Sequence, residues 1–180
     1  MRRARIGFFL TALLLGGVGF VSAGARAASN GDVVVVPIEG TVDAGMAHLV
    51  RRAVDQANAD GAKALVLDIN TPGGLIASAF EIRDAMFASK VPTVAYVSQR
   101  AFSAGALIAL SARKVVMAPG SSIGAAEPIP KTDKLVSALK AEFASTAQRN
   151  GRSRVLAEAM VDKTVDAPAY KKSGAILSLT

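Results

Sequence analysis

From about residue 33 onward, apolar positions follow two alternating patterns. Short runs rich in β-branched residues are typical of strands, and they occupy residues 33–38, 64–69, 92–97, 114–117 and 174–179. Apolar positions three or four residues apart predict helices over residues 43–59, 77–88, 133–150 and 155–161. Strands that alternate with helices in this way predict an α/β fold with a mostly parallel sheet and right-handed crossovers.

Two features of the pattern indicate which elements are buried. The runs at residues 33–38 and 64–69 are continuous rather than alternating, so we expect strands that are covered on both faces. Residues 104–112 are almost entirely apolar, which predicts a short helix at the centre of the fold.

The first 27 residues have the pattern of a secretory signal peptide. Arg2, Arg3 and Arg5 precede an uncharged apolar stretch over residues 6–21, and Ala25–Arg26–Ala27 fits the small-residue cleavage pattern. An uncleaved anchor is the alternative, although the stretch is shorter than the roughly 20 residues of a membrane-spanning helix. Either interpretation predicts that residues 28–180 lie outside the cytoplasm, as a periplasmic or otherwise extracytoplasmic domain.

Composition narrows the chemistry that this domain can perform. The chain has no cysteine and a single histidine, His48, which excludes thiolate zinc sites and a cysteine nucleophile and leaves little basis for a metal site. Aromatic residues make up 5%, too few for a base-stacking surface, so we expect no nucleic-acid partner. The net charge of +7 does not indicate a nucleic-acid-binding surface either, because four of the 21 basic residues lie in the predicted signal. The remaining 17 basic residues face 14 acidic ones.

Thr71–Pro72–Gly73–Gly74 directly follows the second predicted strand. Proline followed by two glycines favours a turn, and a turn between a strand and a helix presents N–H groups that suit an anion or oxyanion. An ordinary strand-to-helix turn explains the same residues.

Ser103 lies between the third predicted strand and the apolar helix, where a nucleophile would fit, although most serines at such a position are ordinary N-caps. No histidine follows it, so a nucleophilic Ser103 needs another base unless His48 reaches it. Lys131 and Lys134 flank Thr132, a candidate N-cap, and the positive end of the helix dipole disfavours a charged ammonium in the first turn. For each lysine a solvated surface position is the alternative.

Taken in order, several motifs resemble the NfeD-type membrane-bound serine proteases of the ClpP class, specifically their N-terminal protease domain. The matching segments cover the chain from about residue 33 to its last residue; they are residues 36–40, 68–74, 103–106, 117–120, 123–126, 150–152 and 159–162. The resemblance implies a ClpP/crotonase-like spiral of βαβ units over residues 28–180. It also implies that the family's C-terminal transmembrane and β-barrel domains are absent from this chain.

The same resemblance assigns roles to individual residues. It implies Ser103 as nucleophile and Lys134 as base, with Lys131 second. The oxyanion hole would be formed by the N–H groups of Gly74, or less favourably Gly73, and of Ala104. Phe102 and Leu107 would shape an apolar substrate site.

The implied activity is endopeptidase cleavage of hydrophobic segments of membrane-associated proteins, with no cofactor. Stomatin-like membrane proteins are the expected partners, and a homodimer is the expected assembly. A non-catalytic scaffold for membrane complexes is the main alternative. Acyl-CoA chemistry of the crotonase type is a second one, and the export signal argues against it because CoA substrates are cytosolic.

Overall fold

The computed structural model describes residues 31–172 and 174–180, so the predicted signal segment lies outside the described residues. The elements in chain order are β1 (Val33–Val42), α1 (Ala44–Asp60), β2 (Ala64–Gly74), α2 (Ile76–Ala88), β3 (Thr93–Phe102), α3 (Ala104–Ser111), β4 (Lys114–Met117), β5 (Ser122–Gly124), α4 (Asp133–Arg149), α5 (Arg154–Val161) and β6 (Ser178–Leu179). These elements match the predicted order, with β5 as an addition inside a predicted loop.

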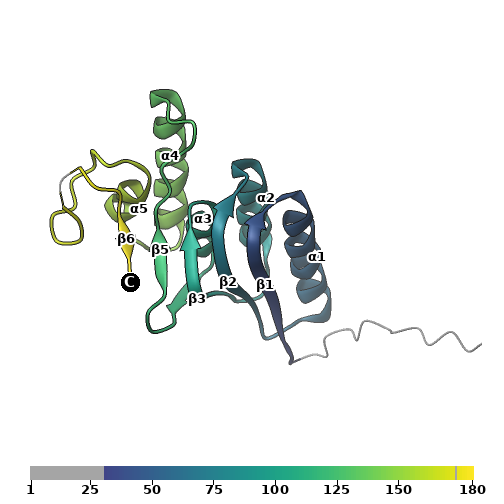
Figure 1. Cartoon of the computed structure of the whole chain (residues 1–180). Helices are drawn as coiled ribbons and strands as arrows, with labels where there is room; N and C mark the ends of the chain where they lie inside the picture. The colour runs from purple at the N-terminus through teal and green to yellow at the C-terminus, as the bar shows by residue number, and fades with distance from the viewer. Residues whose placement is uncertain (1–30, 173) are drawn as a thin grey trace, which may run out of the picture.

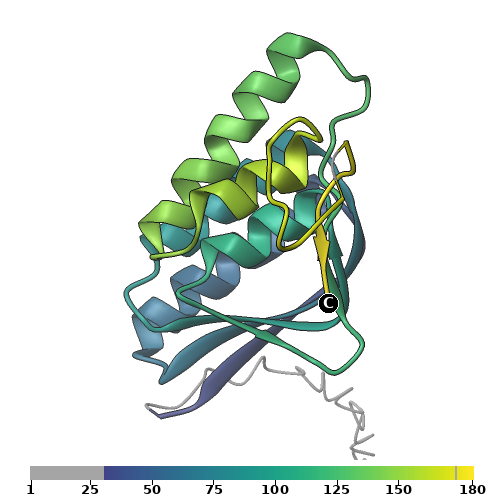
Figure 2. The same cartoon turned by 90° about the vertical axis from the view of Figure 1, so that its left-hand side faces the viewer.

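The strands form one sheet in the order β1-β2-β3-β5-β6, with β4 also pairing with β3. The pairs β1–β2, β2–β3, β3–β4 and β3–β5 are parallel, and β5–β6 is antiparallel. The helices stack on one side of this sheet (Figures 1 and 2). The prediction of an α/β fold with a mostly parallel sheet is therefore confirmed.

Helix α3 is the centre of the core, as its composition predicts. All of its residues are buried, and it packs between the sheet and the other helices. A side chain at Gly105 would place a Cβ 2.5 Å from Cγ2 of Thr71, so the start of α3 lies directly against β2. This close approach requires the small residues at the start of α3.

The expectation that the first two strands are covered on both faces is wrong. Val33 and Val35 on β1 are 51% and 59% exposed, whereas Val36 and Ile38, which point to the helices, are buried. Strand β2 alternates in the same way between buried and half-buried residues. The reason is that the described helices cover only one face of the sheet, and β1 is an edge strand.

The first two strands also extend further than predicted. Residues 71–74 do not form the expected turn but continue β2, with Gly74 beside Val42 of β1, after a register shift between Ile69 and Thr71. A Cβ at Gly74 would lie 2.2 Å from the Val42 carbonyl oxygen, so only glycine permits this pairing. The chain enters α2 directly afterwards, with Leu75 at the N-cap position.

Among residues 31–172 and 174–180, no helix has both the length and the apolar character needed to span a membrane.

Candidate active site

Ser103 joins β3 to α3 in an unusual backbone conformation. Its φ of 52° and ψ of −117° lie in a region that side-chain-bearing residues rarely adopt, and such strain is concentrated at functional sites. Its backbone N–H donates to the carbonyl of Gly124 on β5 at 2.9 Å, which helps to hold the chain in this turn. Ser103 occupies the N-cap position, but its side chain makes no capping hydrogen bond. It therefore differs from an ordinary N-cap serine.

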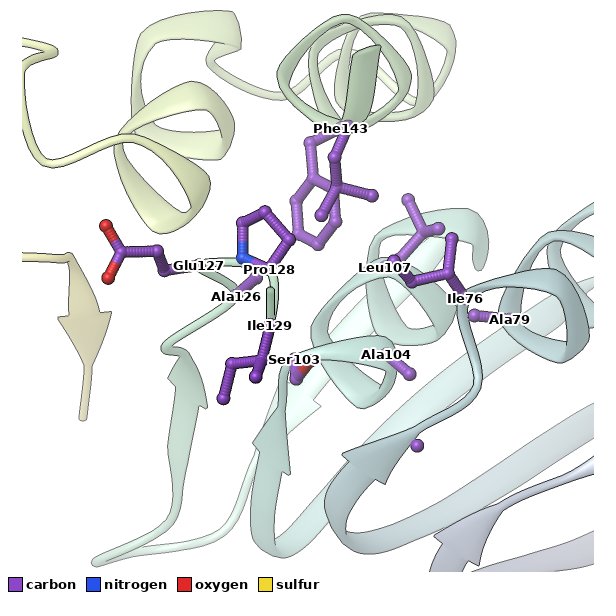
Figure 3. Close-up of a pocket in the computed structure, with 12 residues that line it drawn as sticks. Ile76, Ala79, Ser103, Ala104, Leu107, Ala126, Glu127, Pro128, Ile129 and Phe143 are labelled. Carbon is purple, nitrogen blue, oxygen red and sulfur yellow. The ribbon is translucent and has the colours of Figure 1, made fainter. Parts of the chain in front are cut away.

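The Ser103 side chain borders a cavity of about 180 Å³ between α2, α3, α4 and the segment that follows β5 (Figure 3). Apart from Ser103 and Glu127, the lining consists of glycine and apolar residues: Gly74, Ile76, Ala79, Ala104, Leu107, Ala126, Pro128, Ile129, Leu139 and Phe143. Cavities with this composition suit an apolar side chain beside a few polar groups.

The predicted oxyanion residues lie next to Ser103. A Cβ at Gly73 would be 2.7 Å from the Ser103 Cβ, and Gly74 and Ala104 both border the cavity. The Gly73 N–H already donates to Thr71 Oγ1 at 3.0 Å. Ala104 is the first residue of α3, and the first N–H groups of a helix have no partner within it.

The two candidate lysines lie apart from the cavity lining. Lys134 is exposed in the first turn of α4, where Thr132 Oγ1 accepts from the Leu135 N–H at 3.2 Å, as predicted for an N-cap. Lys131 forms an ion pair with Glu127, which borders the cavity. The structure thus brings Ser103 together with the glycines and Ala104 but does not bring either lysine into contact with it.

Of the two residues expected to shape the substrate site, Leu107 borders the cavity and Phe102 does not. Sequence reasoning did not identify the wall formed by α4, whose members are Leu139 and Phe143. Their spacing of four residues on one apolar face of a helix marks them as buried but does not indicate what they face. His48 is exposed on α1 beside Arg51, consistent with a surface position.

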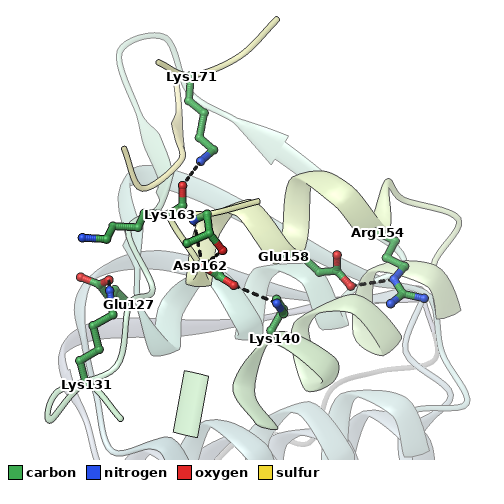
Figure 4. A network of polar contacts seen from close by, with 9 residues as sticks. Glu127, Lys131, Lys140, Arg154, Glu158, Asp162, Lys163 and Lys171 are labelled. Carbon is green, nitrogen blue, oxygen red and sulfur yellow. Dashed lines mark hydrogen bonds and ion pairs between the residues drawn. The ribbon is translucent and has the colours of Figure 1, made fainter. Parts of the chain in front are cut away.

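A polar network next to the cavity wall connects α4 with α5 (Figure 4). Lys140 donates to Asp162 at 2.8 Å, and Thr164 donates to the same carboxylate through its N–H and hydroxyl. These donors, Lys140 foremost, hold the pKa of Asp162 well below its usual range. Near this network the Met160 carbonyl accepts from the Ala126 N–H at 2.7 Å, so α5 also anchors the segment that forms the cavity wall.

Curated relatives of this chain include two membrane proteins. It is 39% identical over 171 residues to the membrane protein NfeD1b of Bacillus subtilis, covering 92% of this chain and 38% of that protein. It is 32% identical over 144 residues to the membrane-bound protease PH1510 of Pyrococcus horikoshii, covering 73% of this chain and 33% of the protease. The chain thus spans about a third of the length of these relatives.

Solved structures that resemble the fold of this chain come from the same kind of protease. A serine-to-alanine variant of the 1510-N membrane-bound stomatin-specific protease superposes with a TM-score of 0.74 at 30% identity, covering 85% of this chain and 74% of that one. A lysine-to-alanine variant of the same protease in complex with a substrate peptide gives 0.73 at 30% identity, with coverages of 85% and 70%. ClpP1 from Listeria monocytogenes, at 18% identity with coverages of 69% and 76%, shares the fold, with a TM-score of 0.57.

The model of one protein family, described as the NfeD1b N-terminal domain, matches residues 32–180. That match covers nearly all of the described residues, and the relatives that the chain resembles include a membrane-bound protease. This chain belongs to the NfeD1b N-terminal domain family and has the fold shared by PH1510 and ClpP-like proteases.

Proposed function

We propose that this chain is a serine-type endopeptidase in which Ser103 is the nucleophile. The observation that carries the proposal is the position of the Ser103 side chain, which makes no capping bond and borders an apolar cavity at the N-terminus of α3. The positive end of the α3 dipole stabilises negative charge that develops there. The similarity to a membrane-bound protease supports the same activity.

The proposed reaction is acyl transfer through a Ser-Lys dyad. Lys134 acts as the general base and accepts the hydroxyl proton while Oγ of Ser103 attacks the peptide carbonyl, and the N–H groups of Gly74 and Ala104 stabilise the oxyanion. The resulting ammonium then protonates the leaving amine. Finally, water activated by Lys134 hydrolyses the acyl-enzyme. Gly73 is the less favourable oxyanion donor, because its N–H is already engaged with Thr71.

Lys134 is preferred to Lys131 as the base because Lys131 is already engaged in an ion pair. Lys131 is paired with Glu127, whereas Lys134 makes no hydrogen bond or ion pair within the described part of the chain. Because Lys134 does not border the cavity, we propose that a bound peptide draws the first turn of α4 towards Ser103.

The test combines active-site labelling with peptide cleavage by the full chain. A fluorophosphonate probe is expected to label the wild type and Ser137→Ala, a control with an exposed serine on α4, but not Ser103→Ala. With a hydrophobic peptide as substrate, Ser103→Ala and Lys134→Ala are expected to lose activity by a factor of about 10³ or more, and Lys131→Ala to keep it.

Two outcomes would contradict parts of this proposal. Equal cleavage by the wild type and Ser103→Ala would exclude the nucleophile. Loss of cleavage in Lys131→Ala with normal activity in Lys134→Ala would identify Lys131 as the base instead.

The apolar cavity lining suits hydrophobic segments of membrane-associated proteins as substrates. The PH1510 N-terminal domain is described as stomatin-specific, and we propose stomatin-like membrane proteins as partners here as well. Residues 1–27 would direct the domain to the extracytoplasmic side of the membrane. A peptide series that places leucine or lysine before the scissile bond would test the preference, with the leucine peptide cleaved faster.

A non-catalytic scaffold is the second candidate, and the positions of the lysines favour it. Neither Lys131 nor Lys134 borders the cavity beside Ser103. A scaffold would bind the hydrophobic peptide without cleaving it, and it would not react with the fluorophosphonate probe.

A further inference from the structure

The carbonyl end of α3 lacks the glycine that commonly closes a helix, and the chain leaves it at Ala112 in an extended conformation, with φ of −73° and ψ of 148°. The last four carbonyls of a helix have no N–H partner within it. Ser111 Oγ donates to the Ile108 carbonyl at 2.6 Å. The Ala112 N–H donates to the Ala109 carbonyl at 3.3 Å. The carbonyls of Leu110 and Ser111 therefore depend on donors from elsewhere in the chain.

Two side chains from the turn between α4 and α5 supply these donors. Asn150 Nδ2 donates to the carbonyls of Leu110 and Ser111, each at 3.0 Å. The Arg152 guanidinium donates to the Leu110 carbonyl at 3.0 Å and, just beyond the helix, to the carbonyls of residues 112–113 at 2.9 and 3.2 Å. The positive charge of Arg152 also lies where the dipole of α3 is negative. We refer to Asn150 and Arg152 together as the α3 clamp.

The α3 clamp joins two helices that border the cavity. Asn150 is the C-cap residue of α4, and Arg152 follows it two residues later. The carbonyl ends of α3 and α4 are therefore held together. The residues proposed to react lie at the opposite ends, because Ser103 precedes the first residue of α3 and Lys134 lies in the first turn of α4.

The turn that carries the α3 clamp is well held. The N–H groups of Gly151 and Arg152 donate to the carbonyls of Gln148 and Ala147 at 3.0 and 2.9 Å, so the turn is bonded to the last residues of α4. Asn150 and Arg152 are both half-buried. A cap that only stabilised α3 would need no connection to a second helix, whereas this one fixes the end of α3 relative to α4.

We propose that Asn150 and Arg152 are positioning residues for Ser103, an inference that rests on the function proposed above. A planar guanidinium bonded to several carbonyls fixes the rotation of a helix end as well as its place. Helix α3 has eight residues, all buried, and is about 12 Å long, so its two ends move together. The α3 clamp thereby sets where Ser103 Oγ and the Ala104 N–H point into the cavity.

The first test measures the position of residue 103 without peptide cleavage. The chain has no cysteine, so Ser103→Cys places a single thiol at the start of α3. A helix N-terminus lowers the pKa of such a thiol, and the rate of its alkylation by iodoacetamide at pH 7 reports that environment. Adding Arg152→Ala is expected to slow alkylation about fivefold or more, because the first N–H groups of α3 no longer point at the sulfur.

The control is Asn58→Ala in the same Ser103→Cys chain. Asn58 is a half-buried asparagine on α1 whose Oδ1 accepts from the Lys90 N–H at 2.8 Å. Like Asn150→Ala, this substitution removes a hydrogen bond between an asparagine side chain and the backbone, but it does not touch α3. It is expected to leave the alkylation rate unchanged.

Two further variants separate position from charge. Arg152→Lys keeps the positive charge, but one ammonium cannot reproduce the planar fork that bonds three carbonyls. Asn150→Ala removes two hydrogen bonds and no charge. Each is expected to slow alkylation about threefold or more. Normal alkylation in Arg152→Lys together with slow alkylation in Arg152→Ala would show that charge alone acts, and it would overturn the positioning role.

The second test uses a hydrophobic peptide as substrate, with Ser103 in place. Arg152→Ala and Asn150→Ala are each expected to lower kcat about tenfold and to change KM less than twofold, because the cavity keeps its walls while the nucleophile is displaced. A cap that matters only for folding would lower the melting temperature and leave kcat unchanged at temperatures where the variant is folded.

Unchanged alkylation and unchanged kcat in the folded clamp variants overturn the proposal, and so does equal slowing in Asn58→Ala. If circular dichroism shows that Arg152→Ala does not fold, Asn150→Ala and Arg152→Lys decide the question. A wild type that cleaves no peptide, combined with a thiol that responds to the α3 clamp, would refute the protease activity and retain the positioning of residue 103. Cleavage that depends on Ser103 but not on the clamp would refute the positioning role alone.

Discussion

At the residue scale, the contact between Ser103 and Gly73 decides the geometry of the site. Ser103 adopts a positive φ so that its side chain borders the cavity, and Gly73, with a φ of 114°, lies against it. No residue with a side chain fits at position 73, because its Cβ would be 2.7 Å from the Ser103 Cβ and 3.1 Å from the Phe102 carbonyl oxygen.

We expect Gly73→Ala to reduce peptide cleavage and fluorophosphonate labelling by about 10²-fold or more, because the added methyl group displaces Ser103. Gly120→Ala is the matched control. Its φ of 77° is also positive, but a Cβ there meets nothing within 4 Å. Both variants bear backbone strain, and only Gly73→Ala is expected to lose activity. Equal activity of the two variants would show that Ser103 does not need this close contact.

At the element scale, α4 and α5 are joined by the Lys140–Asp162 ion pair, whose side chains are 33% and 11% exposed. Asp162 also accepts from Thr164 just beyond the end of α5. Because α4 supplies Leu139 and Phe143 to the cavity, this ion pair positions one wall of the candidate site.

The stability that Asp162 contributes is expected to depend on pH. Lys140 and Thr164 lower the pKa of Asp162 in the folded state, so the unfolded state binds a proton more readily. The contribution is complete above the unfolded pKa of about 3.9, and it is lost as pH falls below that value towards the folded pKa. Asp162→Asn is expected to lower the free energy of unfolding by about 1–3 kcal/mol at pH 7, and by progressively less as the pH falls.

Urea denaturation at a series of pH values measures this difference. Asp84→Asn provides the control, because the Asp84 side chain is 64% exposed and its ion pair with Arg83 contributes little. If the loss of unfolding free energy caused by Asp162→Asn were the same at pH 7 and pH 2.5, the lowered pKa of Asp162 would not be a source of stability.

At the scale of the whole molecule, the sheet has one covered and one open face, and substitutions on the two faces should behave differently. Leu67→Ala on the covered face is expected to cost about 2–5 kcal/mol of unfolding free energy, because Leu67 is fully buried. Val35→Ala on the open face, where Val35 is 59% exposed, is expected to cost less than about 1 kcal/mol of unfolding free energy.

Urea denaturation of the wild type and of both variants measures the two losses of unfolding free energy. If Val35→Ala lowered the stability of the monomer as much as Leu67→Ala does, the open face would have to be covered within the chain itself.

Local pattern was sufficient to predict most of the elements, because hydrophobic periodicity and capping residues act over a few neighbours. The helices begin and end close to their predicted bounds, and Asp43 and Thr132 cap α1 and α4 through their side chains. The buried helix α3 followed from composition alone. Residues 71–74 were predicted as a turn because proline and glycine favour one locally, whereas pairing with β1 keeps them extended.

The amino-acid sequence by itself thus determined the order of elements, the serine at the start of an apolar helix and the absence of cysteine chemistry, since each depends on residue type and local spacing. Only the tertiary structure decided that Gly73 packs against Ser103, that α4 closes the cavity, and that Asn150 and Arg152 bond to the end of α3. These relations join residues far apart in the chain, and they depend on strand register and on which side the helices pack. A pattern of neighbouring residues cannot specify either.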